Sequence, residues 1–222
     1  MEYYYLTFLA VLITLGAEIY VNLMYSKYSK VKNKKKLSGF DAAKKILASN
    51  NLDNIYVVET TGVLTDHYDP KNNVIRLSRG NFNNDSISAV AVAAHEAGHA
   101  IQNSEGNFLL KVRSALIPFV SFSSKFSYIV IVLGLILGYL KLFYFGIALM
   151  LIILLFQLVT LPIEIDASKK GLKFLSKYDI LDKDEISLGK KVLIAAALTY
   201  VASIANTLIE ILRLLIISGD RN

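Results

Sequence analysis

The chain has 222 residues, of which 54% are hydrophobic and 19% are charged, and its formal net charge is +6. A soluble domain usually holds about 45–50% apolar and about 25% charged residues, so this composition argues against a purely soluble protein. The absence of cysteine excludes disulfides, cysteine-ligated zinc and iron–sulfur clusters. The positive balance does not predict nucleic-acid binding, because the lysines cluster beside apolar segments, as they do in membrane proteins.

The first predicted element is a transmembrane anchor over residues 1–25. From Tyr3 to Tyr25 its sequence is almost entirely apolar, with Glu18 the exception, and about 20 such residues span a bilayer. Six lysines follow between residues 27 and 36, whereas no Lys or Arg precedes the apolar segment. The positive-inside rule therefore places the following residues in the cytoplasm. We expect the anchor to be retained, because it lacks the basic start and the cleavage site of a signal peptide.

Residues 26–116 are predicted to form a small cytosolic α+β domain. Ser38 and Asp41 have the spacing of a helix N-terminal cap. A strand is predicted over residues 54–60, and a β-hairpin over residues 62–78, around the turn-forming stretch 69–73. A helix is predicted over residues 86–103, with three candidate capping residues before it, Asn83, Asn84 and Asp85.

The second half of the chain is predicted to hold three further membrane helices. Residues 117–163 form two spans with a tight break at Lys141, so both ends of this helical hairpin lie on the same face of the membrane. Residues 164–190 are predicted to be a cytosolic helix, and residues 191–217 a last span. Glu210 and Arg213 within that span are expected either to pair or to be hydrated at the membrane interface.

A zinc-binding motif lies in the predicted helix over residues 86–103. His95, Glu96 and His99 have the H-E-x-x-H pattern, which puts both imidazoles on one helical face, where they can share a zinc ion. Glu96 is then placed to act as general base on a zinc-activated water and to pass the proton to the leaving amine. Two of the three histidines of the chain fall in this motif.

The third ligand is predicted to be Glu164. It begins the predicted cytosolic helix just after Pro162, a favoured first-turn residue, on the membrane face where the two histidines are expected. Two alternatives stay open, Glu105 and His67. The metzincin spacing that would favour Glu105 also requires a glycine where this chain has Gln102.

The chain resembles the YugP-like neutral zinc metallopeptidases, which are small bacterial membrane proteins. The resemblance covers nearly the whole chain, and beyond the anchor and its lysines it is carried by Leu64–Pro70 (LTDHYDP), Val92–Gln102 (VAAHEAGHAIQ), Phe156–Glu164 (FQLVTLPIE) and Ala197–Ala202 (ALTYVA). The resemblance implies a peptidase in the bacterial cell membrane.

The organisation is also similar to HtpX-type membrane proteases and CAAX prenyl proteases. Those families carry the third ligand in a Glu-x-x-Ala-Asp pattern, in which the Asp braces a ligating histidine. Glu164 and Ala167 match this pattern, but Ser168 stands in place of the Asp. Ser168 is therefore the candidate for supporting a ligating histidine, and Asp166, two positions away from it, is expected to point elsewhere.

Together these observations predict a mainly α membrane protein with about four transmembrane helices and a small zincin-like (gluzincin) domain. The predicted function is a zinc metalloendopeptidase acting at the cytoplasmic face on a peptide or membrane-protein substrate. His67 and Tyr200 are candidates for lining the cleft or stabilising the oxyanion, and the strand over residues 74–78 or its hairpin partner is a candidate for pairing with an extended substrate.

The main alternative is a zinc-binding membrane scaffold or assembly factor without activity, which would need four protein ligands for a closed site. An intramembrane protease is disfavoured, because the apolar run before His95 is too short to span a bilayer. A metal transporter is disfavoured because the predicted hairpin spans carry almost no polar ligand apart from Gln157. The sequence indicates neither the physiological substrate nor the oligomeric state.

Overall fold

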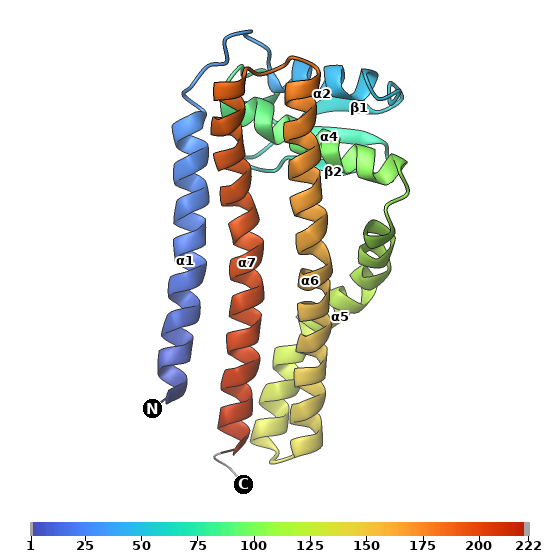
Figure 1. Cartoon of the computed structure of the whole chain (residues 1–222). Coiled ribbons are helices and arrows are strands. Elements are labelled where there is room, and N and C mark those ends of the chain that lie inside the picture. Colours follow the sequence, from blue (N-terminus) through green and yellow to red (C-terminus); the bar gives the residue numbers. More distant parts are fainter. Residues whose placement is uncertain (1, 220–222) are drawn as a thin grey trace. The chain divides into compact units, whose positions relative to one another are not determined.

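The computed structural model describes residues 2–219, and its side chains from residue 4 onward. Helices and strands follow one another in the order α1 (Glu2–Tyr28), α2 (Gly39–Ala48), β1 (Tyr56–Thr60), β2 (His67–Asp69), β3 (Val74–Ser78), α3 (Arg79–Phe82), α4 (Ile87–Ser104), α5 (Phe108–Ile136), α6 (Leu140–Lys177) and α7 (Lys183–Gly219) (Figure 1). In the described part of the chain, four helices are long and apolar enough to cross a membrane, namely α1, α5, α6 and α7. The protein is thus a mainly α membrane protein with one small sheet, as predicted.

The described residues form two compact units, and long helices contribute to both. The span unit contains the chain up to Glu18, residues 111–162 and the chain from Leu198 onward. The site unit contains Ile19–Leu110 and Ile163–Ala197. It holds the whole sheet, α2, α3 and α4, together with the ends of α6 and α7 that meet at residues 178–182.

The sheet of the site unit has three strands in the order β1-β3-β2. The predicted hairpin is present but shorter than expected, because only His67–Asp69 pairs with β3 in the antiparallel sense. β1 joins the other edge of β3 in the parallel sense, with Val57 opposite Ile75. Ile75 and Leu77 are fully buried, so the central strand supplies the apolar face that packs into the core of this unit.

Local capping explains where the helices of the site unit begin. Ser38 and Asp41 form the predicted capping box at the start of α2. The helix predicted over residues 86–103 is present as α4, but its three predicted capping candidates were wrong. Ser86 is the N-cap, and its hydroxyl accepts the backbone N–H of Ala89 at 3.3 Å. The predicted candidate Asn84 does not cap the helix; its side-chain oxygen accepts a hydrogen bond from the backbone N–H of Ser86 at 3.0 Å.

α6 runs through the predicted end of the third span without a break. Pro162 therefore lies inside a helix and not in its first turn, contrary to the prediction. A proline inside a helix costs about 3 kcal/mol, and packing on both sides of it offsets that cost. Past the proline, Ile163, Ala167 and Leu175 are buried in the site unit. Residues 164–190, predicted to form one helix, hold the end of α6, a turn and the start of α7.

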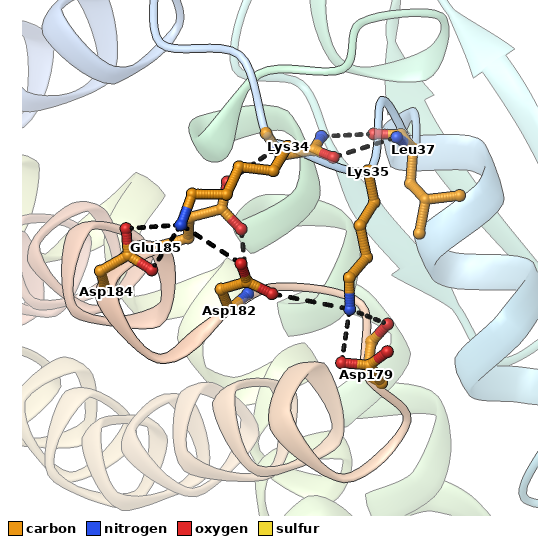
Figure 2. Close-up of polar contacts among 8 residues, drawn as sticks. Lys34, Lys35, Leu37, Asp179, Asp182, Asp184 and Glu185 are labelled. Atoms are coloured by element: carbon orange, nitrogen blue, oxygen red, sulfur yellow. Dashed lines mark hydrogen bonds and ion pairs between the residues drawn. The ribbon is translucent and has the colours of Figure 1, made fainter.

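The segment between α1 and α2 is fastened to the turn between α6 and α7. The Lys34 ammonium contacts Asp182 at 3.2 Å and Asp184 at 3.0 Å, while Lys35 pairs with Asp179 (Figure 2). The buried Glu185 carboxylate accepts the backbone N–H groups of Lys34 at 2.8 Å and Asp182 at 2.9 Å. Two of the lysines that indicate orientation in the sequence thus also hold two distant parts of the site unit together.

The span unit is built mainly by apolar packing between α5, α6 and α7. Its buried cluster contains Ile131, Phe143, Ile147, Met150, Leu154, Ile211 and Leu214. Of the two readings left open for Glu210 and Arg213, the ion pair is present, and Arg213 also donates to the Thr7 hydroxyl on α1 at 3.0 Å. This polar contact therefore joins α7 to α1 within the span unit.

Candidate metal centre

The two motif histidines project from the middle of α4. His95 and His99 are one helical turn apart, and their ring centroids lie 4.6 Å from each other. The alanines and glycine around them are buried, so this part of α4 offers little side-chain bulk to its neighbours. A second helix can therefore approach the α4 backbone closely.

α6 is that second helix, and two glycines set its distance from α4. A Cβ atom added at Gly98 would lie 2.4 Å from the carbonyl oxygen of Ala167. A Cβ atom at Gly171 would lie 2.8 Å from the carbonyl oxygen of Ala94. Because Glu164 lies three residues before Ala167, the same face of α6 that makes this contact carries Glu164 to the histidines.

Three ligand atoms converge at this crossing. One Glu164 carboxylate oxygen lies 3.3 Å from His95 Nε2 and 3.4 Å from His99 Nε2. The two Nε2 atoms are 3.1 Å apart. Among the described residues, these three form the group of histidine and acidic side chains that could hold a metal ion, and Glu164 itself is buried.

The spacing of these atoms fits zinc. Zinc binds imidazole nitrogen and carboxylate oxygen at about 2.0–2.2 Å with tetrahedral geometry, which sets neighbouring ligand atoms about 3.3–3.5 Å apart. The three separations of 3.1, 3.3 and 3.4 Å lie close to this value. Two nitrogens and one carboxylate oxygen also suit zinc chemically. Three protein ligands leave one tetrahedral position open, as in catalytic zinc sites.

The electrostatics of the site are those of a cation site. Burial by itself lowers the pKa of His99, but hydrogen bonding to Glu164 and the charges of Glu96 and Glu164 outweigh it, and the pKa is raised. The carboxylates therefore favour a positive charge at the position of the imidazoles. A metal ion that binds there must displace any proton held by the histidines.

Each motif histidine has a partner at its other ring nitrogen. His95 Nδ1 lies 3.0 Å from the Ser168 hydroxyl, so Ser168 occupies the position expected for an outer support. His99 Nδ1 lies 3.0 Å from the side-chain oxygen of Gln102. The Gln102 amide nitrogen in turn donates to Asp166 at 2.7 Å, so Asp166 contacts the partner of His99 rather than a histidine. The residue patterns considered for direct support of a histidine do not include Gln102, so they do not predict this indirect link.

Glu96 lies on α4 next to the first histidine and is buried. Its charge acts on His99 strongly enough to contribute to the raised pKa of that residue. Glu96 is therefore close to the metal position without belonging to the three-residue ligand group. A carboxylate in that place can exchange a proton with a molecule bound at the open position.

The other candidates occupy different environments. Glu105 is the C-cap of α4 and pairs with Lys170 at 2.8 Å, so its carboxylate is engaged away from the ligand group. His67 lies exposed on β2, with Nδ1 2.8 Å from the Thr65 carbonyl oxygen. Tyr200 is half-buried on α7 and belongs to the span unit, so its role in the cleft stays a prediction.

Comparison with known proteins gives a consistent result. A family described as "Putative neutral zinc metallopeptidase" matches residues 3–219. The chain is 38% identical over 217 residues to the "Putative membrane protease YugP" of Bacillus subtilis (strain 168), which covers 98% of this chain and 96% of that protein. No solved structure matches. The family match over nearly every residue and the 38% identity to this relative along almost the full length of both chains establish that the chain belongs to this neutral zinc metallopeptidase family.

Proposed function

We propose that the protein is a membrane-bound zinc metalloendopeptidase whose metal is held by His95, His99 and Glu164. The observation that carries the proposal is the triangle of ligand atoms, whose sides of 3.1, 3.3 and 3.4 Å suit a tetrahedral zinc ion. When bound, zinc would polarise the scissile carbonyl group and lower the pKa of the attacking water to about 7.

Glu96 is the proposed general base. Its buried carboxylate would take a proton from the attacking water and then deliver the same proton to the leaving amine. Burial beside the ligand group supports this role, because a base must be held near the water that it deprotonates.

The proposed peptide-binding edge is β2. The central strand β3 has a partner on both sides, so of β3 and its hairpin partner β2 only β2 has a side on which no described strand pairs. The side-chain amide of Asn103 on α4 donates to the Tyr68 hydroxyl on β2 at 3.2 Å, which keeps this edge beside the helix of the motif. An extended peptide could add to the edge through backbone hydrogen bonds.

His67, on the same strand, could stabilise the oxyanion only in its doubly protonated form. The Thr65 carbonyl can only accept, so Nδ1 of His67 carries a proton. A neutral His67 then has an unprotonated Nε2 that cannot donate to an oxyanion. His67 could serve as a donor only when both ring nitrogens are protonated.

Lysine placement supports a site on the cytoplasmic face, and the substrate class we propose is a peptide or membrane protein within reach of that face. The alternative of a structural zinc site in a scaffold would require a fourth protein ligand. The ligand group among the described residues has three members, which favours the enzyme.

The test is the zinc content of detergent-purified wild type beside Glu164→Ala, with Glu105→Ala as matched control. We expect one zinc per chain in wild type and in the control, and a sharp loss in Glu164→Ala. Zinc retained in Glu164→Ala would remove Glu164 as ligand. A wild-type protein that takes up no zinc would overturn the proposed function.

A further inference from the structure

We propose that Gln102 and Asp166 are positioning residues that hold His99 with its proton on Nδ1 and with Nε2 free to bind the metal. The inference rests on the proposed function, since it concerns a ligand of the proposed zinc site. It assigns a role to a glutamine and an aspartate that the H-E-x-x-H and Glu-x-x-Ala-Asp patterns do not include.

The orientation of the Gln102 amide is fixed by its surroundings. Its nitrogen lies 2.9 Å from the backbone carbonyl oxygen of Ile163 and 2.7 Å from a carboxylate oxygen of Asp166. A carbonyl and a carboxylate accept hydrogen bonds and cannot donate them, so both must face the NH₂ group. The Gln102 side chain is fully buried, which leaves it no water with which to exchange these partners.

The amide orientation dictates the tautomer of His99. The Gln102 oxygen must face His99 Nδ1, at 3.0 Å, and an oxygen acceptor requires a proton on that nitrogen. Nε2 of a neutral His99 is then the nitrogen with the lone pair. This is the atom that lies 3.4 Å from Glu164 and 3.1 Å from His95 Nε2. The hydrogen-bonded series Asp166–Gln102–His99, called the relay below, therefore leaves the lone pair on the nitrogen that faces the proposed metal position.

Ser168 cannot impose the same constraint on His95. A serine hydroxyl donates or accepts as its neighbour requires, so the 3.0 Å contact with His95 Nδ1 is compatible with either tautomer. The support of His99 is therefore specific, while the support of His95 is adaptable. Asp166 lies three residues after Ile163 on α6, so the Gln102 amide nitrogen can donate to both. Asp166 thus acts on His99 through Gln102 without touching the histidine.

The test is zinc affinity, measured by competition with a chelating dye on the full-length protein in detergent. Gln102→Met keeps the size of the side chain but removes the acceptor, and we expect it to weaken zinc binding about 10–100-fold. Asp166→Ala leaves Gln102 one acceptor, so we expect a smaller loss. The exposed Glu105→Gln is the control and should bind zinc as wild type does.

The double variant tests whether Asp166 acts through Gln102. In the Gln102→Met background, Asp166→Ala should cause no further loss of zinc affinity, because the relay is already broken. Losses that simply add would overturn the relay. Unchanged affinity in Gln102→Met, with wild type holding zinc through Glu164, would also overturn it while leaving the proposed function intact. Absence of zinc binding in wild type would overturn both.

A second measurement needs no substitution. With ¹⁵N-labelled histidine in the zinc-free wild type, at a pH where His99 is neutral, NMR should show His99 protonated on Nδ1, with its proton hydrogen-bonded and slow to exchange. A proton on Nε2 would contradict the proposal even if Gln102→Met failed to fold. A merely structural role for Gln102 would not determine which nitrogen carries the proton.

Discussion

The two units of the protein treat buried polar groups differently. Of the residues that the structure describes, five have a buried side-chain nitrogen or oxygen atom without a hydrogen-bond partner, and all five lie in the span unit: Arg113, Ser123, Ser127, Gln157 and Arg213. In the site unit, by contrast, the buried Gln102 amide uses both its nitrogen and its oxygen. The span unit is held mainly by apolar packing, with the contacts of Arg213 to Glu210 and Thr7 as an exception, whereas the site unit uses polar contacts that fix individual atoms.

The difference has a physical reason. Apolar contacts are not directional, so they stabilise helices without fixing a nitrogen or oxygen to within a few tenths of an ångström. A metal site requires such placement, and hydrogen bonds provide it because they depend on distance and angle. Substitutions at the site should therefore change zinc binding or peptidase activity, whereas comparable substitutions in the span unit should leave both nearly unchanged.

The largest effect is expected at Glu96. Replacement of Glu96 by Gln keeps the shape of the side chain but removes the base, so peptidase activity should fall about 10²–10⁴-fold. Zinc content should stay at the wild-type value, because Glu96 is outside the ligand group. Both quantities can be measured on the same purified sample, and full activity in Glu96→Gln would exclude the general-base role.

A matched pair of glycines compares the packing of the two units. Gly98→Ala brings a methyl group to 2.4 Å from the Ala167 carbonyl oxygen, and we expect a loss of about 1–3 kcal/mol in stability together with weaker zinc binding. Gly16→Ala, in α1, meets no atom within 4 Å and should cause no loss. Thermal unfolding in detergent and zinc titration measure both effects. Equal tolerance at the two positions would mean that the α4–α6 contact does not set the geometry of the site.

Zinc binding should depend on pH because of His99. Its pKa is raised in the metal-free protein, so the interaction with Glu164 stabilises the metal-free fold at low pH and is lost as the pH rises through that pKa. Below the same pKa, the proton competes with zinc, and affinity should fall about tenfold per pH unit for each histidine that must lose a proton. Zinc affinity can be measured by chelator competition from about pH 5 to about pH 8, the range in which histidines usually titrate. Affinity independent of pH would show that His99 is not a ligand.

The smallest effect is expected at Gln157 in the span unit. Its side-chain oxygen is buried without a partner, so Gln157→Leu removes an unsatisfied group and should be neutral or stabilising by about 1 kcal/mol. Zinc affinity should not change. Gln102→Met provides the contrast, since it removes a glutamine whose amide is fully bonded. A large loss of stability in Gln157→Leu would indicate that the span unit also depends on specific polar contacts.

The sequence by itself determined the membrane class, the four apolar helices, the capping box of α2 and the identity of the motif residues. These features depend on local patterns, such as the length of an apolar run or the i, i+4 spacing of two histidines. The N-cap of α4 and the position of Pro162 within α6 were not predicted correctly. Several capping residues stood side by side before α4, and packing on both sides of Pro162 outweighs its local preference.

Only the tertiary structure decided which distant residues meet. The parallel pairing of β1 with β3, the contacts of Lys34 with the turn before α7, and the link from Asp166 through Gln102 to His99 all join segments far apart in the chain. A periodic pattern indicates which face of a helix is apolar but not which residue of another helix it will touch. The close approach of α4 and α6 at Gly98 and Gly171 determines that register, because a glycine has no Cβ atom to keep the two backbones apart.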